Sequence, residues 1–207
     1  MMMLIAWLWV PFVGALFACA AYLGLQLAAH LCDGIEPFED GPKPGKPPTP
    51  WLIAGAGAIG AVVTAQGASL PQLAMAAIIV VALAGCWYSD VRVGIVPDYF
   101  TLIPLGVLLL IAVVIHDWQT IIAAVSITVP FASAAALSKG RGMGWGDVKL
   151  VALGGAALGL QIAVLAFSAA CLLAVCVAVF RRRAREPIPF APYLVGATAL
   201  GLTLNIF

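Results

Sequence analysis

Three aspartates beside apolar segments are the residues of this chain best suited to chemistry. Asp90 follows an apolar run, Asp98 comes eight residues later after a proline, and Asp147 follows a glycine-rich stretch at 140–146. Ionisable side chains next to hydrocarbon are costly, so they usually serve a function. Two carboxylates held close together cannot both ionise easily, and such a pair can act as base and acid toward one water molecule. The pattern predicts aspartic proteolysis, with no metal, cofactor or covalent nucleophile.

The composition predicts that these aspartates belong to a membrane protein. Of the 207 residues, 64% are hydrophobic and 9% are charged, whereas soluble domains contain about 45–50% apolar and about 25% charged residues. The 10 Lys and Arg are balanced by 9 Asp and Glu, which leaves no basic excess for binding phosphates. We therefore expect an all-α polytopic protein whose partner is the lipid bilayer and not a nucleic acid.

Apolar runs of the length needed to cross a bilayer recur along the chain. A span takes about 20 mostly apolar residues. Such runs lie at residues 3–31, 51–66, 70–88, 99–115, 120–137, 150–180 and 188–207. The run at 150–180 is too long for one upright helix, and glycines near 155–161 favour a tight reversal. The runs therefore predict about eight transmembrane helices, with the three aspartates in the polar loops at their ends.

The basic residues predict the orientation of these helices. Short loops rich in Lys and Arg stay in the cytoplasm. With the N-terminus outside, every Lys and Arg falls on the cytoplasmic side; they are Lys43, Lys46, Arg92, Lys139, Arg141, Lys149, Arg181, Arg182, Arg183 and Arg185. The outward turns carry Asp117 and no basic residue. Asp90, Asp98 and Asp147 are then all expected at the cytoplasmic face.

The domain organisation is expected to be simple. Residues 1–207 are interpreted as a single membrane domain, and residues 32–50 as a short cytoplasmic loop rich in Pro, Gly and acidic residues. A loop of this composition cannot bury a core of its own. Its carboxylates lack the spacing of a calcium-binding loop, so no metal site is expected there.

Three stretches resemble motifs of one family. Residues 142–150, Gly-Met-Gly-Trp-Gly-Asp-Val-Lys-Leu, resemble the G-x-G-D-x-K-L motif of the type IV prepilin peptidases. Asp90, followed by Ile-Val-Pro-Asp at 95–98, resembles the first motif of that family. Residues 188–194, Ile-Pro-Phe-Ala-Pro-Tyr-Leu, are similar to its late I-P-F-G-P-F-L segment, with Ala191 in place of a glycine. The resemblance runs from about residue 88 to the C-terminus.

The resemblance implies a GxGD-type aspartic protease architecture and a specific reaction. It implies a membrane aspartic endopeptidase that removes the leader peptide of type IV prepilin or pseudopilin precursors at the cytoplasmic face of the bacterial inner membrane. By motif position, the catalytic pair is Asp90 and Asp147, while Asp98 is structural. Lys149 is either an anchor at the membrane surface or an electrostatic partner of Asp147.

The N-terminal third departs from the longer members of that family. Those members carry paired CxxC motifs that hold zinc, and they also methylate the new N-terminal amine. The loop at 32–50 has only Cys32, so the four thiolates of a structural zinc site cannot be assembled. The chain resembles the short form, and its sequence gives no support for N-methyltransferase activity.

Three alternatives remain open at this point. A general GxGD intramembrane protease would act on other single-span substrates. A small ion-coupled or proton-coupled transporter could use the same aspartates, and it would hold them near the middle of the bilayer. A catalytically silent assembly subunit is the third alternative.

Overall fold

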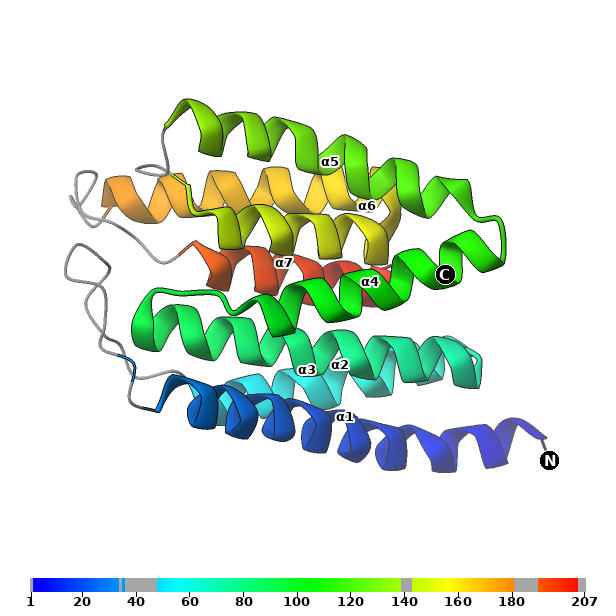
Figure 1. The fold of residues 1–207 in the computed structure, drawn as a ribbon. Coiled ribbons are helices and arrows are strands. Elements are labelled where there is room, and N and C mark those ends of the chain that lie inside the picture. Colours follow the sequence, from blue (N-terminus) through cyan, green and yellow to red (C-terminus); the bar gives the residue numbers. More distant parts are fainter. Residues whose placement is uncertain (1, 34, 36–47, 139–142, 181–189, 205–207) are drawn as a thin grey trace.

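The protein is a bundle of helices that run side by side (Figure 1). The computed structural model describes residues 2–33, 35, 48–138, 143–180 and 190–204, and all regular structure in these ranges is helical. The helices are α1 (Met2–Cys32), α2 (Thr49–Ala65), α3 (Leu70–Val93), α4 (Asp98–Val114), α5 (Trp118–Leu137), α6 (Trp145–Phe180) and α7 (Ala191–Leu204). The expected all-α class is confirmed.

Helix α6 consists of two segments that run in opposite directions. Gly159 interrupts it with a non-helical backbone, at φ 71° and ψ 165°. Glycine adopts a positive φ readily because it has no Cβ. The chain reverses at this break, and its two halves lie antiparallel in Figure 1. The predicted hairpin near 155–161 is confirmed, while the number of segments that cross a bilayer stays a prediction.

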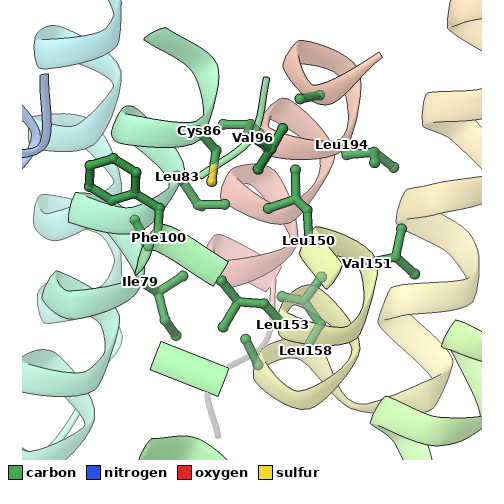
Figure 2. Packing of buried hydrophobic residues seen from close by; sticks show 14 of the residues in the cluster. Ile79, Leu83, Cys86, Val96, Phe100, Leu150, Val151, Leu153, Leu158 and Leu194 are labelled. Carbon is green, nitrogen blue, oxygen red and sulfur yellow. The ribbon is translucent and has the colours of Figure 1, made fainter. Parts of the chain in front are cut away.

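Two groups of helices make up the bundle. Helix α1 packs on α2 and α3, and α6 packs on α5 and α7. Contacts of α3 with α4 and α7 join the two groups. A smaller apolar cluster that includes Phe17 and Val80 fills the first group. The larger cluster draws on α3, α4, α6 and α7, with Ile79, Leu150 and Leu194 among its buried members (Figure 2).

The outside of the bundle is apolar, as a membrane protein requires. Four helical segments are long and apolar enough to cross a bilayer: Trp9–Cys32, Leu70–Val93, Trp118–Leu137 and Trp145–Phe180. Large apolar side chains point outward along the bundle, among them Leu110, Leu165 and Leu200. Such side chains are favourable in hydrocarbon and costly in water. The chain is a membrane protein.

Two predicted helix boundaries were wrong, and both concern the aspartates. Helix α3 continues past residue 88 to Val93, and α6 begins at Trp145, before residue 150. Asp90 and Asp147 therefore lie within helices and not in loops. Helix α3 ends where Gly94 takes a left-handed conformation, at φ 73°, and donates its N–H to the Asp90 carbonyl. This is a common helix termination, and it depends on backbone geometry more than on apolarity.

Several predicted features lie outside the described residues. They include most of the loop at 32–50 with Lys43 and Lys46, the basic residues at 139 and 141, the arginines at 181–185, and Ile188 and Pro189 of the late motif. Helix α1 ends at Cys32 and α2 begins at Thr49, on either side of that loop.

Candidate active site

The ends of several helices meet at one end of the bundle. The C-terminal end of α3 and the N-terminal ends of α4, α6 and α7 lie together there (Figure 1). Asp90 is in the last turn of α3, and Asp147 is in the first turn of α6. The fold thus brings together two carboxylates that are far apart in the sequence.

The Asp90 carboxylate is buried and only partly satisfied. Its residue is 7% exposed. The backbone N–H of Ala191, the first residue of α7, donates a hydrogen bond to it. The first N–H groups of a helix have no partner within the helix and carry partial positive charge, so they suit a carboxylate. Oδ2 of Asp90 accepts no hydrogen bond from any residue that the structure describes. One oxygen is therefore fixed and the other is free.

The Asp147 carboxylate is fixed by the start of its own helix. The backbone N–H of Gly144, just before α6, donates to it. A side chain in the first turn that accepts from the residue before the helix forms half of a capping box. The same turn lies against the connection between α3 and α4: a Cβ added at Gly146 would be 2.8 Å from Cβ of Val96. Glycine at 146 therefore permits this close approach.

The two carboxylates interact with each other and share a buried neighbour. Asp90 and Asp147 are close enough for electrostatic repulsion. The thiol of Cys86, one turn before Asp90 on α3, interacts electrostatically with both. Cys86 is fully buried in the apolar cluster that also contains Val96 and Leu150 (Figure 2). Low-dielectric surroundings strengthen electrostatic interactions, so the repulsion between these carboxylates is less screened than it would be in water.

Asp98 has a different partner. It is the first residue of α4, its side chain is 58% exposed, and its Oδ1 lies 2.5 Å from Nζ of Lys149. The ion pair links the start of α4 to α6, two residues after Asp147. Lys149 was interpreted either as an anchor at the membrane surface or as an electrostatic partner of Asp147. The structure supports neither directly, because the ammonium group of Lys149 pairs with Asp98.

Three features of the site were missed by reasoning from the sequence. They are the hydrogen bond from Ala191, the buried position of Cys86, and the ion pair of Asp98 with Lys149. Cys86 could have been found, because it lies four residues before Asp90 and so shares its helix face. It was missed because α3 was expected to end at residue 88. No local signal in the sequence pairs Ala191 with Asp90.

Comparison with models of known protein families identifies a match. A family model described as the type IV leader peptidase family matches residues 76–179. The matched region runs from α3 into α6 and contains Asp90, Asp98 and Asp147. A search of curated proteins and a search of solved structures found no match.

Proposed function

The chain belongs to the type IV leader peptidase family, and we propose that it is an aspartic endopeptidase whose catalytic groups are Asp90 and Asp147. The observation that carries the proposal is the pairing of these two buried carboxylates, from α3 and α6, at one end of the bundle. Ionisable groups that perturb one another at buried positions are typical of catalytic sites.

The pair has what general acid and base catalysis requires. One carboxylate, ionised, takes a proton from water as the water oxygen attacks the carbonyl carbon of the scissile peptide. The other, protonated, donates to the carbonyl oxygen. As the C–N bond breaks, the first carboxyl group gives the proton it took from water to the leaving amine, and a hydroxyl of the intermediate returns its proton to the second carboxylate. Oδ2 of Asp90 is buried and has no hydrogen-bond donor among the described residues, so we assign it as the oxygen that accepts a hydrogen bond from the water when substrate and water enter the site. The hydrogen bonds from Ala191 and Gly144 keep both carboxyl groups oriented without neutralising them.

The substrate is proposed to be a prepilin or pseudopilin precursor. The support is the resemblance of the three motifs, which implies a cut after a glycine, between a short basic leader and an apolar helix. Catalytic groups near the ends of α3 and α6 suit a scissile bond at the membrane surface. The described basic residues Arg92 and Lys149 belong to the same helix ends as the aspartates, which favours the cytoplasmic face of the inner membrane.

The position of the aspartates counts against the transporter alternative. A transporter would hold such carboxylates near the middle of the bilayer, on discontinuous helices. Asp90 lies in the last turn of α3 and Asp147 in the first turn of α6. A general intramembrane protease would share the same pair, so the choice of substrate must be made by experiment.

The test is a cleavage assay with the membrane-embedded enzyme. The chain is co-expressed with a panel of pilin-like precursors that carry a basic leader, a glycine and an apolar helix, and with single-span proteins that lack the leader. We expect a gel shift for the precursors only, with mass spectrometry locating the cut after glycine. The same spectra report whether the new amine carries a methyl group.

Matched aspartate variants complete this test. Asp90→Asn and Asp147→Asn should each lower cleavage by about 10⁴-fold or more, since each removes one half of the acid and base pair. Asp98→Asn, at the exposed ion pair, should retain most activity. Full activity of either Asp90→Asn or Asp147→Asn, in protein shown to be folded in membranes, would contradict the proposed dyad.

A further inference from the structure

An apolar groove runs along the bundle between α7 and the second half of α6. It has a volume of about 670 Å³. Small residues face it from both helices, with Ala166 and Ala170 on α6 and Gly196 and Ala197 on α7. Apart from Trp87 of α3, its lining comes from these two helices alone. We call it the α6–α7 groove.

One end of the α6–α7 groove is lined by the first turn of α7, the turn that begins at Ala191. Pro192 and Tyr193 line it, and they directly follow Ala191, whose N–H holds Asp90. Trp87 also lines it and lies three residues before Asp90 on α3. From there the groove extends along α7 to Leu204, at the last turn of that helix. It thus begins at the end of α7 that holds Asp90 and follows that helix to its other end.

Two other apolar cavities are not lined by the first turn of α7. A cavity of about 210 Å³ lies among α1, α2, α3 and α7, and one of about 440 Å³ lies among α1, α3 and α4. Neither is lined by Pro192 or Tyr193, although Trp87 also lines the smaller one. The α6–α7 groove is larger than both, and its lining includes the residues that directly follow Ala191, which holds Asp90.

The walls of the groove are suited to a helix. A peptide inside hydrocarbon must satisfy its own backbone hydrogen bonds, so an apolar segment of a substrate is helical there. Membrane helices pack closely where small residues line the contact, and the groove has such residues that are not buried, Ala166 and Ala169 on α6 and Gly196 and Ala197 on α7. A Cβ added at Gly196 would meet no atom within 4 Å. The surface of the groove is therefore open at this position.

We propose that the α6–α7 groove binds the apolar helix of the substrate, with the N-terminal end of that helix beside Asp90 and Asp147. The inference rests on the proposed function. Seated in the groove, the apolar helix would bring the peptide bond just before it to the level of the carboxylates. The occupant is an apolar transmembrane segment of a protein, and a lipid acyl chain is the competing outcome of the test.

The first test fills the groove with a side chain of the enzyme. Gly196→Leu should raise the KM for a full precursor by about tenfold or more, because it takes the space of the substrate helix. Gly106→Leu on α4 is the matched control, since Gly106 also has no atom within 4 Å of an added Cβ and does not line the groove. Gly196→Ala should have little effect. Thermal melts of the three variants report whether each remains folded.

The second test locates the substrate directly. A photoreactive residue in place of Leu165 or Leu200, which line the groove and are 72% and 68% exposed, should crosslink to the apolar helix of the precursor. The same replacement at Leu110, which is 65% exposed on α4, should not. Using Asp147→Asn enzyme keeps the precursor intact during irradiation.

The outcomes separate this inference from the proposed function. No cleavage of any precursor by the wild-type enzyme contradicts the proposed function. Normal cleavage by the wild type together with equal KM values for Gly196→Leu and Gly106→Leu contradicts the groove alone. Crosslinks from Leu165 and Leu200 to lipid only would likewise overturn it.

Discussion

Asp90 illustrates at the scale of one residue how a site can be maintained at a cost to stability. Its carboxylate is 7% exposed, has one oxygen without a hydrogen-bond donor among the described residues, and repels Asp147. Burial of a charged group with incomplete hydrogen bonding is unfavourable, and a like charge nearby adds to the penalty. A residue kept only to stabilise the end of α3 would not be expected in such surroundings.

Removing this charge should therefore not destabilise the protein. We expect Asp90→Asn to leave the free energy of unfolding unchanged or to raise it by about 1 kcal/mol, because repulsion and charge burial are relieved. The measurement is the apparent Tm in detergent or in bilayers. Asp98→Asn, which loses an exposed ion pair, serves as the comparison and should change stability by less than about 1 kcal/mol. A marked fall in Tm for Asp90→Asn alone would indicate a structural role for Asp90.

At the scale of helices, the start of α6 depends on contact with the α3–α4 connection. Gly146 precedes Asp147, and a Cβ added there would be 2.8 Å from Cβ of Val96, which is buried. Such a contact is tighter than van der Waals packing allows, so the first turn of α6 would have to shift. The shift would move Asp147 relative to Asp90, and small displacements of catalytic groups are costly for rate.

We expect Gly146→Ala to lower kcat about 10²-fold while destabilising the fold by about 1–3 kcal/mol. The double variant Gly146→Ala with Val96→Ala should recover much of the lost kcat, because the shorter side chain makes room for the new methyl group. The single variant Val96→Ala measures how much the space left by the shorter side chain lowers stability and kcat. Steady-state cleavage of a precursor by the four proteins forms a double-mutant cycle. Additive effects on kcat would show that the contact does not position Asp147.

The helices themselves could largely be predicted from the sequence, whereas their polar ends could not. Length and apolarity locate a span because hydrocarbon admits only a backbone that satisfies its own hydrogen bonds. Apolarity does not predict the helical residues 89–93 and 145–149, because these segments include polar side chains. Helix α3 ends at Gly94, which takes a left-handed conformation, and α6 begins after Gly144, whose N–H bonds to Asp147. Motif resemblance drew attention to Asp90 and Asp147, which the structure brings together, and their catalytic role stays a prediction. The hydrogen bond from Ala191 depends on the packing of α7 and leaves no local pattern.

At the scale of the whole molecule, charge is distributed unevenly between the two ends of the bundle. Arg92 and Lys149 belong to the helix ends that carry the aspartates. At the opposite end, the turns between α2 and α3 and between α4 and α5, at 66–69 and 115–117, contain no Lys or Arg. Because basic residues are retained in the cytoplasm, this asymmetry predicts that Asp90 and Asp147 face the cytoplasm.

Cysteine labelling in intact spheroplasts checks this orientation. In a background with the five natural cysteines replaced by alanine, a membrane-impermeant maleimide should label Gln119→Cys, near the α4–α5 turn, from outside. Arg92→Cys should react only after lysis, because it lies at the end of α3 beside the carboxylates. Both side chains are exposed, so a difference in labelling reports their side of the membrane. The cysteine-free chain must remain unlabelled and still cleave a precursor. The reverse pattern would put the carboxylates outside, where a leader that remains in the cytoplasm could not reach them.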